Sequence, residues 1–451
     1  MELLTAAASE ADQRRVAGGL RARGLGAGDR VALVTTSSGA MLSAILGALR
    51  IGVVPVLLNA GLLDHERATL LADARPDLVV DDAALAALLE AAPVELAPWP
   101  LARPMHYTSG TTGRAKGVWS GVLDEADAAA LLAEEAELWA FDAGDRHLVC
   151  SPFHHSVSIR FGAGTLLAGG TVVIPGPFDA SLVARAIAEV EPTTTFMVPA
   201  HLQRLLAMGE VPSLRGFRLL AHAGAPCPEP LKQRVFDLVG IDRVWEFYGS
   251  TEGQFTACSG PAWVDHPGTV GRARAHRRLS VDDDGTIWCE VPGYARFEYW
   301  GDPDKTAAAW RPADPTGASG ERGVLAPHGS FTVGDLGRLD DDGYLYLDGR
   351  RDDLIISGGV NVYPAEVEAA LARCAGVDAV AVFGVEDERW GQRVCAAVVG
   401  AAAPEVVLTF AREQLAPYKR PKQVFAVDAL PETVTGKVQR TRLPELLGLD
   451  G

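Results

Sequence analysis

The spacing of apolar residues in the first half of the chain alternates between the helical and the strand period. Residues 6–23 have helical spacing, and residues 30–36 (RVALVTT) have the composition of a buried strand. A helix and the strand VVPVLL follow within 41–63, and 123–139 is an amphipathic pattern with an acidic first turn. The alternation continues from residue 181. Strands that alternate with helices are typical of a parallel α/β sheet.

From about residue 255 the pattern changes to that of antiparallel β-structure. In LSV-DDDG-TIWCEV and GRL-DDDG-YLYL, an Asp-Gly turn lies between apolar runs, which predicts two hairpins. Beyond Arg350, a helix that begins at Pro364 is followed by two strands and a second helix. We therefore predict an α/β protein. Residues 1–350 would form a large domain of α/β sheets plus a β-rich subdomain, and 351–451 a small mobile α+β domain.

An ordinary apolar content excludes an intrinsically disordered chain. Of the 451 residues, 48% are hydrophobic and 22% are charged, as in globular proteins generally. The formal net charge of −17 disfavours duplex nucleic acid and anionic membranes as partners. The negative net charge does not exclude nucleotides as ligands, because local basic sites can bind small anions.

The cysteines and the first residues indicate a reducing compartment. The six cysteines are too widely spaced for a C-x-x-C pair, so we expect free thiols. The start, MELLTAAASEADQRR, carries acids where a signal peptide needs basic and then apolar residues. Arg50, Pro55 and Asn59 interrupt the apolar stretch 41–63, which favours a helix, a turn and a strand over a membrane span. We expect a cytoplasmic protein.

The segment YTSGTTGRAKGV has the composition of a phosphate-binding loop. Its glycines let backbone N–H groups converge, its hydroxyls add donors, and Lys116 adds a positive charge. It is not a Walker loop, which needs Gly-Lys-Ser/Thr after a four-residue gap. The alternative is a polar surface turn. The candidate phosphate ligands are Thr108, Ser109, Gly110, Thr111, Thr112, Gly113 and Lys116.

Two later segments carry further polar candidates. In FYGSTEG, Glu252 would hold Mg²⁺, Thr251 would bond a phosphate oxygen and Tyr248 would stack near a base. The alternative is a strand-end turn with a solvated glutamate. In VGDLG and the following YLYLDGRRDD, Asp335 would accept from ribose hydroxyls and Arg350 would meet a phosphate or ribose. Ordinary hairpin chemistry is the alternative there.

A lysine on a glycine turn lies near the end of the chain. The segment PETVTGKVQR places Lys437 directly after a glycine. A solvated surface lysine is the alternative for this segment taken alone.

Together and in this order, the four segments resemble the adenylate-forming superfamily of acyl-CoA synthetases, peptide-synthetase adenylation domains and firefly-type luciferases. The resemblance runs from about residue 10 to 445 and implies an enzyme that uses ATP, Mg²⁺ and coenzyme A. In the implied first step, a carboxylate attacks the α-phosphorus of ATP, giving an acyl-AMP and pyrophosphate. A thiol then attacks the acyl carbon and AMP leaves.

The resemblance also implies roles for individual residues. Lys437 would bridge the acid oxygen and the α-phosphate, Glu252 would hold Mg²⁺, and Thr251 would touch the α-phosphate. Asp335 would hold the ribose hydroxyls with help from Arg350. The adenine side of the site would comprise Gly224, Ala225, Pro226, Tyr248 and Gly249.

The same resemblance implies that the small domain turns between the two steps. The pivot would be Asp352, and the turn would bring the face of Gly358 and Gly359 to the site. Trp390 would line a thiol tunnel; a capped surface loop is the alternative. The CoA phosphates would meet a basic turn formed by Lys419, Arg420 and Lys422, whose alternative is a solvated surface turn.

The acid itself is the least defined ligand. His154 matches a family position that closes over the acid, and a small aromatic or short aliphatic acid is our expectation. The expected pocket residues are Phe196, Val198, His222, Ala223 and Phe247. Fewer residues precede the phosphate loop than is usual in the family. The alternatives to a CoA ligase are an enzyme that loads a carrier protein and a non-catalytic nucleotide-binding regulator. The protein would be a monomer or a homodimer.

Overall fold

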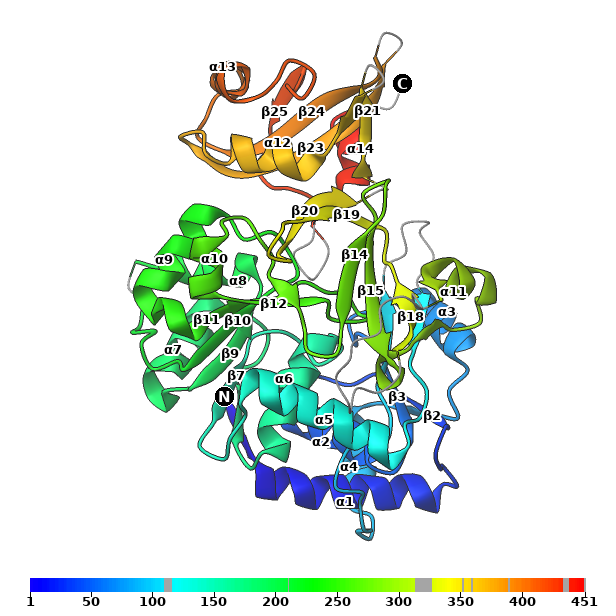
Figure 1. Ribbon diagram of the computed structural model, residues 1–451. Helices are drawn as coiled ribbons and strands as arrows, with labels where there is room; N and C mark the ends of the chain where they lie inside the picture. Colours follow the sequence, from blue (N-terminus) through cyan, green and yellow to red (C-terminus); the bar gives the residue numbers. More distant parts are fainter. Residues whose placement is uncertain are drawn as a thin grey trace.

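The computed structural model describes residues 1–108, 116–209, 211–312, 327–350, 353–357, 360–387, 390–432 and 438–449. Within these ranges, the chain forms two α/β sheets, a β-rich region and a C-terminal α+β unit (Figure 1). This arrangement agrees with the predicted fold class.

The first α/β sheet has six strands. Its order is β16 (Glu298–Tyr299), β6 (Lys116–Trp119), β5 (Met105–Thr108), β3 (Val54–Leu57), β2 (Arg30–Leu33) and β4 (Leu78–Val80). Strands β4, β2, β3 and β5 are parallel, whereas β6 and β16 are antiparallel to their neighbours. Its helices are α1 (Ala6–Ala22), α2 (Gly39–Leu49), α3 (Asp64–Ala74) and α4 (Asp82–Leu89). The predicted helix over 6–23 is confirmed, and the strand predicted over 30–36 ends at Leu33.

The second α/β sheet has eight strands, which come from later residues except for β1 at the start of the chain. Its order is β1 (Glu2–Thr5), β8 (Thr171–Ile174), β7 (Arg146–Val149), β9 (Thr194–Met197), β10 (Leu219–His222), β11 (Val244–Glu246), β12 (Thr256–Ser259) and β13 (Arg272–Ala273). The five central strands are parallel. Its helices are α6 (Ser156–Leu167), α7 (Ala180–Val190), α8 (Pro199–Leu206), α9 (Glu229–Val239) and α10 (Gly260–Asp265).

The β-rich region confirms both predicted hairpins. Strands β14 (Arg278–Val281) and β15 (Ile287–Pro292) pair with Val281 opposite Ile287. Strands β19 (Asp335–Leu339) and β20 (Leu345–Arg350) pair with Leu339 opposite Leu345. The Asp-Gly turns therefore lie where the sequence places them. Near them are α5 (Glu125–Trp139), α11 (Pro303–Ala309), β17 (Trp310–Arg311) and β18 (Pro327–Phe331).

The C-terminal unit lies above β19 and β20 in Figure 1, and its helix α12 (Pro364–Leu371) contacts β20. Its strands are β21 (Ile355–Ser357), β22 (Val360–Val362), β23 (Val377–Asp387), β24 (Gly391–Gly400) and β25 (Gln423–Ala426). Its other helices are α13 (Pro404–Gln414) and α14 (Leu443–Leu446). The unit has its own buried apolar cluster, which includes Val367, Leu371, Val394 and Val407.

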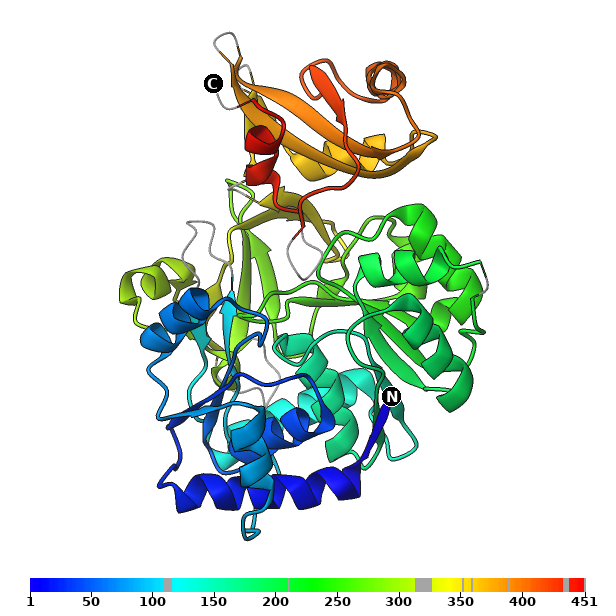
Figure 2. The ribbon, with the colours of Figure 1, turned by 180° about the vertical axis from the view of Figure 1, so that it is seen from behind.

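Helices α2 and α6 form the layer between the two sheets. Helix α2 contacts β3, helix α6 contacts β7 and β8, and the two helices contact each other. Helix α1 crosses beneath them along the base of the molecule (Figure 2). The apolar stretch 41–63 thus contains a buried helix and a buried strand, and no helix in the described ranges is long and apolar enough to cross a membrane.

Helices α1 and α2 approach so closely that one glycine is required. A Cβ placed on Gly47 would lie 2.5 Å from the carbonyl oxygen of Gln13. Beside this contact, the Ser9 and Ser43 hydroxyls are 2.9 Å apart, and Arg50 donates to Gln13 Oε1 at 2.8 Å. The contact therefore combines close backbone packing with buried polar bonds.

We expect Gly47→Ala to lower the free energy of unfolding by about 1–3 kcal/mol, because the methyl group would force the helices apart. Chemical denaturation at constant m-value measures the change. Gly26→Ala is the matched control, since no atom lies within 4 Å of its added Cβ. Equal stability of the two variants would contradict the close-packing argument.

Candidate active site

A tight turn follows β11 and carries the segment YGSTEG. The Ser250 N–H donates to the Gly253 carbonyl at 2.8 Å, and Gly249 forms an isolated antiparallel bridge with Gln254. A Cβ on Gly249 would lie 2.6 Å from the Gln254 Cα. The glycine thus allows the chain to reverse at the carboxyl end of a parallel strand, where open α/β sheets bind their ligands.

Glu252 projects from this turn into a buried position. It is 7% exposed, and its Oε1 accepts a hydrogen bond from the Tyr299 hydroxyl at 2.9 Å. A solvated glutamate, the alternative considered for this segment, does not fit this burial. Mg²⁺ prefers oxygen ligands and is often held by one or two carboxylates plus substrate phosphates. Glu252 fits that use, whereas no group of three acidic, histidine or cysteine residues in the described ranges would hold a metal alone.

Tyr248 joins the turn to the second hairpin. Its hydroxyl donates to Asp335 Oδ2 at 2.5 Å, although the two residues are 87 positions apart in the sequence. Asp335 begins β19 and is 8% exposed. The predicted base and ribose contacts are therefore neighbours at one site.

The predicted adenine segment borders the same strand ends. Gly224 has φ of +91°, two residues after β10 ends at His222. The Phe247 N–H donates to the His222 carbonyl at 3.2 Å, which holds the ends of β10 and β11 together. Ala225 and Pro226 follow Gly224, and neither is buried. Gly224 to Pro226 and Tyr248 thus lie at the carboxyl ends of adjacent parallel strands.

The ends of the predicted phosphate loop are adjacent. Thr108 in β5 and Lys116 in β6 are register partners in an antiparallel pair. Ser109, Gly110, Thr111, Thr112 and Gly113 lie outside the described residues, as does the side chain of Thr108. The loop therefore connects two neighbouring strands of the first sheet.

Several predicted residues near the C-terminal unit also lie outside the described residues: Asp352, Gly358, Gly359 and Lys437. The backbone of Arg350 pairs with that of Asp335 across β19 and β20, but its side chain is outside the described part. Their roles stay predictions.

Two of the predicted CoA residues lie together. The Lys422 ammonium is 5.1 Å from the centre of the Trp390 ring and donates to the Pro417 carbonyl at 3.1 Å. Lys419 forms an ion pair with Glu366. Arg420 donates to the Leu415 carbonyl at 2.7 Å. The basic turn is therefore held by contacts within the C-terminal unit, beside an indole ring.

His154 is partly buried. Its carbonyl is 3.1 Å from the His106 Nδ1, and its ring centre is 4.3 Å from that of His155. Burial lowers the pKa of His154 to about 4, so the ring is neutral at physiological pH. A neutral imidazole packs against a carboxylic acid without adding a charge.

The expected acid-pocket residues lie in a packed hydrophobic cluster. Phe196, Ala223 and Phe247 are buried there with Trp139 and Phe161. Val198 packs against the same cluster, and His222 is buried. Burial, followed by repulsion from Lys232, lowers the pKa of His222 well below its usual value.

A cavity of about 180 Å³ lies on the other side of α6 and is lined by a different set of residues. Thr251, Gly253 and Gln254 form one wall, and apolar side chains from α2, α5 and α6 form much of the rest. Its charged lining is formed by Arg103, Glu135, Arg160, Arg274 and Arg277. The Arg160 guanidinium lies 5.9 Å from the centre of the Phe247 ring, so the cavity and the expected pocket meet there.

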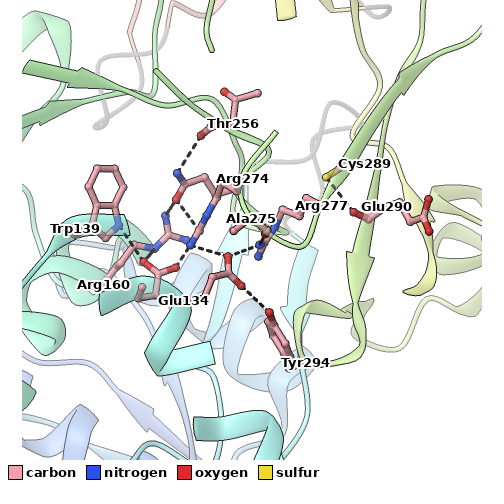
Figure 3. Close-up of polar contacts among 12 residues, drawn as sticks. Glu134, Trp139, Arg160, Thr256, Arg274, Ala275, Arg277, Cys289, Glu290 and Tyr294 are labelled. Carbon is pink, nitrogen blue, oxygen red and sulfur yellow. Dashed lines mark hydrogen bonds and ion pairs between the residues drawn. The ribbon is translucent and has the colours of Figure 1, made fainter. Parts of the chain in front are cut away.

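Two glutamates of α5 organise three of these arginines (Figure 3). Glu134 forms ion pairs with Arg277 and, at 2.8 Å, with Arg274, and it accepts from the Tyr294 hydroxyl. Glu135 accepts from Arg274 at 2.9 Å and lies 3.5 Å from Arg160. Burial by itself would raise the pKa of Glu135, but Arg160 and Arg274 outweigh it and lower the pKa.

Sequence reasoning missed this cluster. Its local signals are charged residues within apolar runs, such as Arg160 in SVSIRFGAG and Glu134 and Glu135 in ALLAEEAELW. Surface charges give the same signal on amphipathic helices. The pairing joins residues up to 143 positions apart, so no local pattern reveals it.

A ligand site at the ends of parallel strands places this chain among the open-sheet α/β proteins. The sequence model of the AMP-binding enzyme family matches residues 2–294, and that of the AMP-binding enzyme C-terminal domain matches residues 366–437. The chain belongs to the AMP-binding enzyme family.

Curated relatives match over nearly the whole chain. A 2-succinylbenzoate–CoA ligase of Geobacillus sp. (strain WCH70) is 32% identical, covering 94% of this chain and 89% of the relative. The long-chain-fatty-acid–CoA ligase FadD13 of Mycobacterium tuberculosis is 31% identical, and the match covers 98% of this chain and 93% of the relative.

Solved structures agree in fold. ATP-bound MatB from Rhodopseudomonas palustris is 31% identical with a TM-score of 0.82, covering 98% of this chain and 93% of that chain. The o-succinylbenzoate CoA synthetase MenE from Bacillus subtilis, in complex with its acyl-adenylate intermediate, is 28% identical with a TM-score of 0.80, covering 97% and 92%.

We expect Glu134→Gln to lower the free energy of unfolding by about 3–5 kcal/mol, because it removes the carboxylate that pairs with the buried guanidinium of Arg277 and one of the two carboxylates that pair with Arg274. Thermal or urea denaturation measures the loss. Glu137→Gln, at an exposed site on the same helix, should change stability by no more than about 0.5 kcal/mol. If Glu134→Gln lowers the free energy of unfolding as little as Glu137→Gln does, the ion pairs of Glu134 contribute little to stability.

Proposed function

We propose that this protein is an ATP-dependent carboxylic acid–CoA ligase that works through an acyl-adenylate. The observation that carries the proposal is the turn after β11, which directs Tyr248 to Asp335, Glu252 to Tyr299 and Thr251 to the cavity. The CoA ligases among its relatives support the same reaction.

In the proposed first step, the substrate carboxylate attacks the α-phosphorus of ATP and pyrophosphate leaves. Thr251 bonds the α-phosphate, and Lys437 bridges that phosphate and the attacking oxygen. Catalysis consists mainly of positioning and of stabilising charge on the phosphate oxygens. The loop residues Ser109 to Gly113 with Thr108 and Lys116 hold the β- and γ-phosphates.

The nucleoside is held by the strand ends. Asp335, fixed by the Tyr248 hydroxyl, accepts from the ribose hydroxyls, with Arg350 beside it. Gly224 to Pro226, Tyr248 and Gly249 flank the adenine. Glu252 would hold Mg²⁺, which neutralises phosphate charge when it is bound. Tyr299 fixes the Glu252 carboxylate in place.

In the proposed second step, the CoA thiol attacks the acyl carbon and AMP leaves. We divide the chain into an N-terminal domain of 1–350 and a C-terminal domain of 351–451 that turns about Asp352. The turn withdraws Lys437 and brings Gly358 and Gly359 to the site. Trp390 contacts the pantetheine, and the CoA phosphates meet Lys419, Arg420 and Lys422.

The acid enters beside His154 and Thr251. We propose that Phe196, Val198, His222, Ala223 and Phe247 form the wall that adjoins the cavity at the Arg160–Phe247 contact. The six free cysteines support a cytoplasmic location.

The deciding experiment incubates the protein with ATP, Mg²⁺, a panel of carboxylic acids and either CoA or a phosphopantetheinylated carrier protein. Mass spectrometry then identifies which thiol is acylated. Acyl-CoA is the expected product. If only the carrier protein is acylated, the acceptor is the carrier and not CoA. If no acid causes pyrophosphate release, the proposal is overturned.

We expect Lys437→Ala to slow acyl-adenylate formation by about 10²-fold or more, because it removes charge stabilisation from the reacting phosphate. Thioester formation from supplied acyl-AMP should continue. Pyrophosphate release and acyl-CoA formation are assayed separately, with Arg442→Ala as a nearby exposed control. An equal loss in both half-reactions would contradict the two-conformation scheme.

A further inference from the structure

We propose that the cavity beside Thr251 binds the far end of the acid substrate, and that this end carries a second carboxylate which pairs with Arg103. The inference rests on the proposed ligase function and adds the substrate class, a short dicarboxylic acid. Three observations support it: the charge of the lining, the absence of a hydrogen-bond or ion-pair partner for Arg103 in the described part of the chain, and the position of Thr251.

The lining of the cavity carries excess positive charge. Among the described residues, its charged side chains are four arginines and the carboxylate of Glu135. Including Glu134 behind the wall, four guanidinium groups face two carboxylates. Buried charge of one sign is unfavourable unless a counter-charge is present. A ligand anion would provide that counter-charge.

Arg103 is the arginine of the lining that takes no part in these hydrogen bonds and ion pairs. Gln254 Oε1 accepts from Arg160 at 2.5 Å and from Arg274 at 3.0 Å, and the two glutamates hold Arg274 and Arg277. Among the described residues, Arg103 has no hydrogen-bond or ion-pair partner. Its guanidinium therefore remains available to a ligand in the cavity.

The surroundings of Arg103 also lower the pKa of its guanidinium. Burial, followed by repulsion from Arg160 and Arg277, lowers its pKa to about 10. Arg274 is 5% exposed, and its Nε has no hydrogen-bond partner in the described part of the chain. A carboxylate at this end would receive charge-assisted bonds from a planar guanidinium fork.

The apolar part of the cavity determines which group can connect the two carboxylates of the ligand. Leu131, Ile159 and Phe331 contribute apolar walls, and Thr251 lies in the same lining as Arg103. A ligand that spans the cavity thus has one carboxylate beside the proposed α-phosphate contact and another beside Arg103. The small volume, about 180 Å³, favours a short apolar spacer between the two groups.

The test compares matched acids that differ by one carboxylate: butanoate with butanedioate, hexanoate with hexanedioate, and benzoate with terephthalate. Acid-dependent pyrophosphate release gives kcat and KM for each. At least one diacid should have a kcat/KM about tenfold or more above that of its monoacid. If every monoacid is activated as well as its diacid, the inference fails while the ligase function stands.

Variants separate recognition from folding. Arg103→Gln should raise the KM of the preferred diacid about tenfold or more and leave that of its monoacid unchanged, while Arg103→Lys should keep part of the preference. Without ligand, Arg103→Gln should be at least as heat-stable as the wild type, because it removes buried like-charge repulsion. Arg296→Gln, at an exposed site next to the cavity residue Ala295, is the control. An unchanged diacid preference in Arg103→Gln would overturn the inference.

Thermal shifts with each acid, with and without ATP, distinguish a failure of the ligase function from a failure of the diacid site. Suppose that no acid releases pyrophosphate. A diacid that still stabilises the wild type but not Arg103→Gln would then support the site and contradict the ligase function. No stabilisation by any diacid would overturn both.

Discussion

The reversal of the chain at Gly249 is the constraint on which the candidate site depends. Only a residue without a Cβ fits against Gln254 there, and the reversal directs three successive functional groups to different neighbours. Tyr248 reaches the second hairpin, Thr251 faces the cavity, and Glu252 reaches Tyr299 at the end of the first sheet. One turn thus connects the second α/β sheet, the first sheet and the β-rich region.

The layer between the two sheets has a second role besides packing. Helices α2 and α6 contact each other closely, yet with α5 and the turn they leave a cavity. The α5 glutamates fix three arginines around this space and leave the guanidinium of Arg103 facing it. The buried ion pairs and hydrogen bonds of this network restrict the side chains that line the cavity, so they hold its walls in place before a ligand arrives. Such preorganisation lowers the cost of binding.

The C-terminal unit has its own apolar cluster and meets the rest of the chain near β20. An independent core allows a unit to move as a body, which a two-step ligase requires. The basic turn at Lys419 to Lys422 is held by local bonds, so it would move with its unit.

The sequence by itself determined the class of fold, the two hairpins and the family. Periodicity and Asp-Gly turns are local properties, and four ordered motifs are specific in combination. Tertiary structure decided which residues meet. The Tyr248–Asp335 bond, the burial of Glu252 and the arginine cluster join residues that are far apart in sequence. Arg160 and Glu134 look like ordinary helix charges until folding excludes water from them. Their role depends on burial and on distant partners, which no local pattern encodes.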